Sequence, residues 1–246
     1  MTLPDGRQLS FAEYGSPEGK PILFFHGLAG SRCDAIHLHN IALMNDCRLL
    51  SMDRPGMGLS SIDKKRTILS WANDVEAFVD YLGIKKFSII GHSGGAPFVA
   101  ACAYKIPNRL NGVAIVAGMG PFEIPEATSS LSRGQRFLNG AIRSMPWVAT
   151  AMMQLTLMMF KRPWLLKYGL KQMPEVDQLA LRSLGSHEEL AAMMMETFRQ
   201  GVAGASQEMQ LTVKPWGFDL TSIKLKCPVT VWQGGLDSRW REIALP

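Results

Sequence analysis

The sequence is poor in cysteine. It has four, Cys33, Cys47, Cys102 and Cys227, and no two of them stand at C-x-x-C spacing. This scarcity argues against a small secreted fold stapled by disulfides, and it implies no metal site. Three of the four cysteines lie in apolar surroundings typical of core strands or helices. We therefore expect free thiols, as is usual in a reducing compartment.

Long apolar runs and strongly charged tracts are also missing. The most apolar stretch, residues 145–160, contains Pro146 and Gln154 and is too short to span a bilayer. Residues 2–10 are polar and turn-like, unlike a signal peptide. The 26 basic and 21 acidic residues are spread along the chain, without the aromatic-interleaved basic stripe typical of nucleic-acid binding. We expect a cytoplasmic protein with a small-molecule partner, no nucleic acid and no membrane span, and we leave its oligomeric state open.

Strand and helix patterns alternate between about residues 21 and 118. A strand over 8–14 precedes them, and residues 71–82 carry apolar side chains at helical spacing up to Gly83. Short apolar runs predict further strands over residues 21–26, 47–52, 87–90 and 113–117. This alternation predicts an α/β fold with a mostly parallel sheet flanked by helices on both faces.

The alternation stops after about residue 120. Residues 121–215 predict helices only, one of them marked by a capping box from Ser186 to Glu189, and strand character returns after Pro228. We therefore expect a core formed by residues 1–120 and 216–246 and an all-helical cap over 121–215. Ten of the fifteen methionines lie between Met145 and Met209. They indicate either helix packing or a deformable apolar pocket for an acyl or alkyl group.

Residues 87–101, FSIIGHSGGAPFVAA, place a serine at the turn from a strand to a helix. A side chain at such a sharp turn needs small neighbours, which Gly91, Gly94 and Gly95 provide. The hydroxyl of Ser93 is then expected to project from the carboxyl edge of the sheet. The helix that starts there directs N–H groups at the same place, so the Gly94 amide can donate to a developing oxyanion.

These residues resemble the α/β-hydrolase superfamily of serine esterases, lipases and aminopeptidase-like enzymes. Residues 24–32, FFHGLAGSR, resemble the family's HG oxyanion loop, which would make Leu28 the second oxyanion donor. Residues 52–60, MDRPGMGLS, resemble a loop-shaping turn in which Asp53 and Arg54 would bond locally. Residues 229–237, VTVWQGGLD, resemble the strand and loop that deliver the triad acid, which would be Asp237. Asp219 is a weaker candidate for that acid.

The family's histidine is not found at its usual place. In this superfamily the chain order is serine, acid, histidine, and no histidine follows Asp237. The resemblance therefore implies that the last strand and helix of the fold are missing and that the chain is truncated at its carboxyl end. His26 is expected to shape the HG loop and His92 to point away from Ser93. His37 and His39 are expected on the surface of a first helix, and His187 at the start of a cap helix.

The resemblance implies a serine hydrolase that cleaves a carboxylic ester with a hydrophobic portion through an acyl-enzyme at Ser93. Gly27, His92 and Met119 would line the substrate site, and neither a cofactor nor a metal would be needed. Four alternatives stay open: a peptidase like proline iminopeptidase that acts on an amide, a carbon–carbon hydrolase or cofactor-free peroxidase, a non-catalytic ligand-binding protein, and a truncated inactive homologue.

Overall fold

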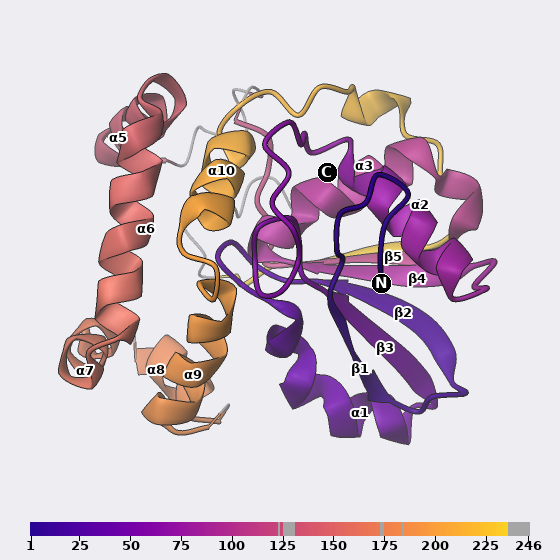
Figure 1. Cartoon of the computed structure of the whole chain (residues 1–246), viewed down its shortest axis with the longest axis horizontal. Helices are drawn as coiled ribbons and strands as arrows, with labels where there is room; N and C mark the ends of the chain where they lie inside the picture. Colours follow the sequence, from indigo (N-terminus) through magenta and orange to yellow (C-terminus); the bar gives the residue numbers. More distant parts are fainter. Residues whose placement is uncertain (123, 125–130, 173–174, 184, 236–246) are drawn as a thin grey trace.

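The computed structural model describes residues 1–122, 124, 131–172, 175–183 and 185–235. Within them, a six-stranded sheet runs in the order β1-β3-β2-β4-β5-β6 (Figure 1). Only the β1–β3 pair is antiparallel among these strands, so the predicted mostly parallel sheet is confirmed. The strands are β1 (Phe11–Gly15), β2 (Lys20–Phe25), β3 (Cys47–Met52), β4 (Phe87–His92), β5 (Leu110–Val116) and β6 (Val229–Trp232).

Helices cover both faces of this sheet because the buried strands are apolar on both sides. On β2, Leu23 and Phe25 belong to the large core cluster under α2 and α3, whereas Phe24 belongs to a second cluster with Ala35 and Ala42. The elements involved are η1 (Arg32–Leu38), α1 (His39–Met44), α2 (Trp71–Tyr81) and α3 (Ala96–Lys105). The strand predicted from Gln8 begins instead at Phe11, because Gln8 forms an isolated bridge with Thr2.

In the described residues between β5 and β6, the structure assigns helices and no strand. The predicted capping box is confirmed at α9, where Ser186 Oγ accepts from the Glu189 amide and the Glu189 carboxylate accepts in return from Ser186 N–H. The helices are α5 (Arg133–Ser144), α6 (Pro146–Phe160), α7 (Pro163–Lys171), α8 (Glu175–Ser183), α9 (His187–Thr197) and α10 (Ala203–Thr212). The predicted boundaries of core and cap stay a prediction.

Met153 of α6 serves packing. Met153 and Ala149 are buried in a cluster with Ala205 and Met209 of α10, because α6 turns this side toward α10. None of the described helices is both long and apolar enough to cross a membrane. All four cysteines are free, as expected.

Candidate active site

Ser93 occupies a strained turn between β4 and α3. Its φ is +50°, in the left-handed region that a side chain makes costly, and one turn of 3-10 helix connects it to α3. Ala29, after the HG loop, and Ala117, after β5, also have positive φ. These three residues follow β2, β4 and β5 at the carboxyl edge of the sheet. Among the described non-glycine residues, one more has positive φ, Asp46, which precedes β3 at the opposite edge, so three of the four lie where the sequence predicts the site.

The glycines around Ser93 allow the HG loop to lie directly on the turn. A Cβ added at Gly94 would lie only 2.6 Å from the backbone nitrogen of Leu28, and one at Gly95 would overlap the carbonyl oxygen of Phe25. A Cβ at Gly27 would lie 3.6 Å from the Cβ of Ser93. The predicted oxyanion donors, Leu28 and Gly94, are thus neighbours beside the serine. Their catalytic role stays a prediction.

A cavity of about 410 Å³ adjoins the serine. Leu28, His92, Ser93 and Met119, all singled out from the sequence, line it. Its other lining residues were not predicted, since they lie in the segment after β5 and on α5, where no motif marks them: Ala117, Phe122, Leu131, Gln135, Leu138 and Asn139. The methionines of α6 and α9 are not among the described lining residues of this cavity, and a pocket formed by them stays a prediction.

A second cavity, of 380 Å³, lies against α3, β5 and β6 and shares Met119 with the first. Its described lining is apolar apart from Trp216 and Gln233, and it contains no nucleophile or base. Of these two cavities, the one beside Ser93 is the candidate site. Among the described residues, no group of three or more His, Cys, Asp or Glu side chains is placed to hold a metal ion.

His26 is fully buried and both of its ring nitrogens are engaged. Nδ1–H donates to the carbonyl oxygen of Gly27 at 2.8 Å, and Nε2 accepts from the Arg54 amide at 3.4 Å. Burial and the nearby Arg54 charge hold the pKa of His26 well below its usual value. A neutral ring fixed in this way shapes the loop, as predicted, and has no free nitrogen to take a proton from Ser93.

His92 lies at the exposed side of the same cavity, where partial desolvation lowers its pKa. Its Nδ1 is 3.5 Å from the Cβ position built on Gly27, beside Ser93. No hydrogen bond joins the Ser93 hydroxyl to any residue that the structure describes. His37 and His39 are exposed on η1 and α1, as expected.

The two candidate acids differ in what can be said of them. Asp237 lies outside the described residues, so its predicted place in the triad stays a prediction. Asp219 is exposed and caps the 3-10 turn η4 (Leu220–Ser222), where its carboxylate accepts from Thr221 N–H and Thr221 Oγ1. Asp219 therefore has a local structural role.

Arg54 does not bond only within its turn, as the sequence suggested. Its guanidinium is fully buried and forms a two-point ion pair with Glu208 of α10, at 2.7 and 2.6 Å. It also donates to the carbonyl oxygens of His26 and Gly27, at 2.8 and 2.9 Å, and lies over the ring of Phe98. The correction has a physical reason: a buried guanidinium needs a carboxylate, and its turn offers none because Asp53 is bound elsewhere.

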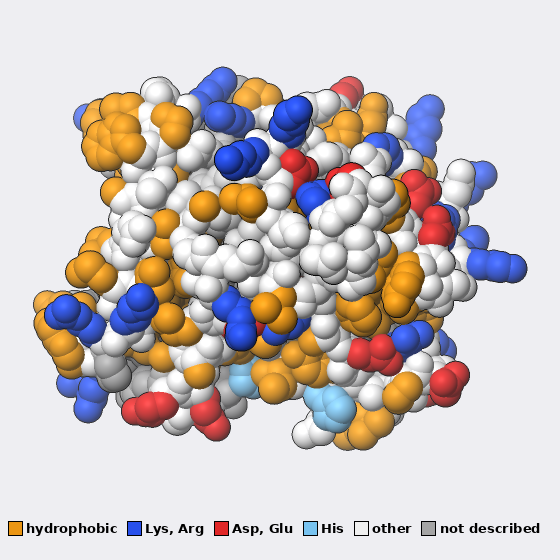
Figure 2. All heavy atoms as spheres, in the orientation of Figure 1, with side chains coloured by type: hydrophobic (Ala, Val, Ile, Leu, Met, Phe, Trp, Pro, Cys, Tyr) orange, Lys and Arg blue, Asp and Glu red, His pale blue; other side chains and the backbone are white. Residues whose placement is uncertain are grey.

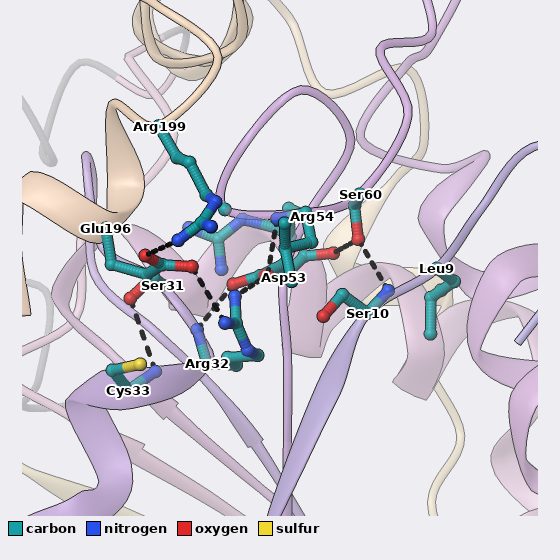
Figure 3. A network of polar contacts seen from close by, with 12 residues as sticks. Leu9, Ser10, Ser31, Arg32, Cys33, Asp53, Arg54, Ser60, Glu196 and Arg199 are labelled. Atoms are coloured by element: carbon teal, nitrogen blue, oxygen red, sulfur yellow. Dashed lines mark hydrogen bonds and ion pairs between the residues drawn. The ribbon is translucent and has the colours of Figure 1, made fainter.

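Asp53 instead joins the HG loop to the cap, as Figure 3 shows. Its carboxylate accepts from the backbone N–H and the guanidinium of Arg32, both at 2.6 Å, and from Leu59 N–H within its own turn. Arg32 also donates to Glu196 of α9 at 2.7 Å, and Glu196 accepts from Arg199. The turn that the sequence interpreted as local thus fixes the HG loop and connects it with the helical segment.

Comparisons with known proteins agree with this geometry. The family described as "alpha/beta hydrolase fold" matches residues 20–150, which include the HG loop and Ser93. The chain is 31% identical over 116 residues to a dihydrolipoyllysine-residue acetyltransferase component of the acetoin cleaving system from Pseudomonas putida, covering 47% of this chain and 31% of that protein. It is 32% identical over 112 residues to the bifunctional esterase/perhydrolase DCH of Acinetobacter calcoaceticus, covering 44% of this chain and 40% of that protein.

The chain spans less than half the length of these two relatives. Among solved structures, epoxide hydrolase A from Mycobacterium thermoresistibile is similar with a TM-score of 0.69 at 19% identity, covering 94% of this chain and 80% of that one. At that identity the likeness shows the fold alone.

Proposed function

We propose that this chain, which belongs to the alpha/beta hydrolase fold family, hydrolyses carboxylic esters through an acyl-enzyme at Ser93. The observation that carries the proposal is the strained serine at the end of β4, with the Leu28 amide packed against Gly94 and a cavity beside it. A serine held in this way presents its hydroxyl to a ligand and not to the interior.

The reaction would follow from these groups. Ser93 Oγ attacks the ester carbonyl carbon, and the carbonyl oxygen becomes an oxyanion that the N–H groups of Leu28 and Gly94 stabilise. The carbon–oxygen bond to the alcohol then breaks and leaves an acyl-serine, which water cleaves to return the acid and free Ser93. The proton of Ser93 passes through a base to the departing alcohol.

Arg54 supports the oxyanion donor through a shared peptide group. The carbonyl of Gly27 and the N–H of Leu28 belong to the same amide, and that carbonyl accepts from both the Arg54 guanidinium and His26 Nδ1–H. Donation to the carbonyl end polarises the amide, which makes its N–H a stronger donor. The buried positive charge behind the loop acts in the same direction on an oxyanion.

We propose His92 as the base, a role that the sequence analysis did not expect of it. Of the histidines whose side chains the structure describes, it alone lines the cavity with Ser93. Both ring nitrogens of His26 are already hydrogen-bonded. Asp237 is the proposed acid on the sequence alone, because it comes five positions after the last residue of β6 and the family's acid follows this strand. The carboxylate would orient the histidine and stabilise its cation.

The lining of the cavity favours an ester with an apolar acyl group. Leu28, Met119, Phe122, Leu131 and Leu138 contribute apolar surface, and Gln135 and Asn139 offer hydrogen bonds. No carboxylate stands in the described lining to bind the ammonium of an amino-terminal peptide. Both an esterase and a proline iminopeptidase are among the relatives, and the apolar lining supports an ester as the first substrate class to test.

The test is hydrolysis of p-nitrophenyl butyrate by the full chain beside Ser93→Ala, with Ser88→Ala on the same strand as the matched control. We expect turnover in the parent and the control and none in Ser93→Ala. A fluorophosphonate should label the peptide that contains Ser93. Equal rates for Ser93→Ala and the parent, or labelling at another residue, would contradict the proposal. Faster cleavage of a p-nitroanilide would favour the peptidase alternative.

A further inference from the structure

The net positive charge of the chain comes from one helical segment. Residues 131–172 contain seven of the 26 basic residues and none of the 21 acidic ones. The rest of the chain is left with 19 basic and 21 acidic residues, so the whole net positive charge comes from this segment. It forms α5, α6 and α7, which make one outer edge of the molecule (Figure 1).

The outward side of α7 combines aromatic and basic side chains. Four residues of α7 stand at positions i, i+3, i+4 and i+7, which places them on one face: Trp164, Lys167, Tyr168 and Lys171. Trp164 and Tyr168 are each 65% exposed, and both lysines are exposed, whereas Leu166 is buried. Lysine and large aromatic rings on one exposed face are typical of helices that lie in a membrane interface.

The neighbouring helices extend this surface. On α6, Trp147, Leu155 and Met158 are exposed at helical spacing, opposite the buried Met153, and the helix contains no charged residue. On α5, Phe137 is 79% exposed. We call Phe137, Trp147, Leu155, Met158, Trp164, Lys167, Tyr168 and Lys171 the α5–α7 face. Figure 2 shows apolar side chains along this edge, with basic ones among them at the end where Figure 1 places α7.

We propose that the α5–α7 face binds the surface of a membrane that contains anionic lipids. The positive charge, with no acidic residue in residues 131–172, complements a negative lipid surface, and the exposed rings and aliphatic groups would enter the headgroup region. A second copy of the chain is a poorer occupant. A symmetric contact would bring the same positively charged face against itself.

Binding there would bring the proposed active site close to the lipid. Gln135, Leu138 and Asn139 of α5 line the cavity beside Ser93, while Phe137 of the same helix belongs to the α5–α7 face. One helix, about 10 Å across, therefore separates the membrane surface from the cavity. This consequence rests on the proposed function, whereas membrane binding itself does not.

The experiment is flotation of the full chain with vesicles of phosphatidylcholine alone and of phosphatidylcholine mixed with phosphatidylglycerol, at low and at high salt. We expect flotation with the anionic vesicles at low salt, and its loss with neutral vesicles or high salt. The charge variant is Lys167→Gln with Lys171→Gln. Its matched control is Lys64→Gln with Lys65→Gln, which removes two exposed charges from the segment between β3 and α2. Removing the two charges of α7 should weaken partitioning about 25-fold, at roughly fivefold for each charge.

The aromatic contribution has its own matched pair. Tyr168→Ser should weaken flotation, while Tyr81→Ser, at an equally exposed tyrosine of α2, should not. All these positions are exposed, so thermal unfolding of the variants should match that of the parent. Carrying out flotation in the Ser93→Ala background separates this proposal from the esterase proposal, because lipid binding needs no turnover.

Three results would overturn the proposal: no flotation with anionic vesicles at low salt, an equal loss in the control variants, or a dimer in sedimentation velocity that Tyr168→Ser dissociates while vesicles bind nothing. The last result would assign the α5–α7 face to a second copy of the chain.

Discussion

Neutralising Glu208 should destabilise the whole chain, since this carboxylate is the anion of a buried cluster. Glu208 is fully buried and lies between two guanidiniums, those of Arg54 at 2.6 and 2.7 Å and of Arg66 at 3.2 Å. Glu208→Gln keeps the shape of the side chain and removes its charge. Two buried cations then remain without their carboxylate.

The expected cost follows from what the two cations keep. Breaking a buried ion pair by removing one partner costs about 3–5 kcal/mol, because an uncompensated charge stays buried. Arg54 retains two carbonyl oxygens and the ring of Phe98, and Arg66 retains the Gly204 carbonyl and Gln207. These neutral partners prevent a larger loss. We expect the free energy of unfolding to fall by about 3–5 kcal/mol, a large part of the total for a domain of this size.

Equilibrium unfolding in urea, followed by tryptophan fluorescence and by circular dichroism, measures this loss. The matched control is Asp80→Asn, which neutralises a carboxylate paired with Arg109 but 60% exposed in its side chain. That change should cost at most about 1 kcal/mol. If Glu208→Gln were as stable as Asp80→Asn, the cluster would not hold α10 on the core, and the reasoning would be refuted.

Three further predictions concern the loop beside Ser93. Gly94→Ala should abolish esterase activity and cost about 1–3 kcal/mol, because its Cβ would press on the Leu28 amide; Gly140→Ala, on open α5, should be neutral or stabilising. Arg54→Lys should lower kcat about tenfold at unchanged KM, since a lysine cannot bridge both loop carbonyls; a change in KM alone would contradict this. The folded protein keeps His26 neutral, whereas His26 in the unfolded chain takes up a proton below about pH 6.5. The contribution of His26 to the unfolding free energy of the parent should therefore fall by about 1.4 kcal/mol for each pH unit below that value. His26→Gln should lack this contribution, and parallel pH profiles in denaturant would disprove it.

Local patterns predicted the elements and the turn at Ser93, because spacing and glycines act within a few residues. Such patterns did not predict contacts between residues that are far apart in the sequence. Arg54 lies 154 residues from Glu208, and nothing near Arg54 marks that pair. A signal did exist on the other side, since Glu208 stands alone in an otherwise uncharged helix. The sequence analysis missed the basic and aromatic face of α7 for a different reason. Its four residues alternate with apolar ones along the chain, and only the helical backbone brings them to one side.

The position of α10 changes how the helical segment relates to the site. By sequence α10 belongs to the predicted cap, and its Ala205 and Met209 do pack in one cluster with Ala149 and Met153 of α6. Yet a Cβ on Gly204 would overlap the Gly56 carbonyl, so the backbones of α10 and of the turn after β3 touch. Through Glu208 and Arg54, α10 also reaches the peptide whose N–H is the proposed oxyanion donor. A displacement of α10 would therefore be expected to disturb the HG loop through the Glu208–Arg54 ion pair.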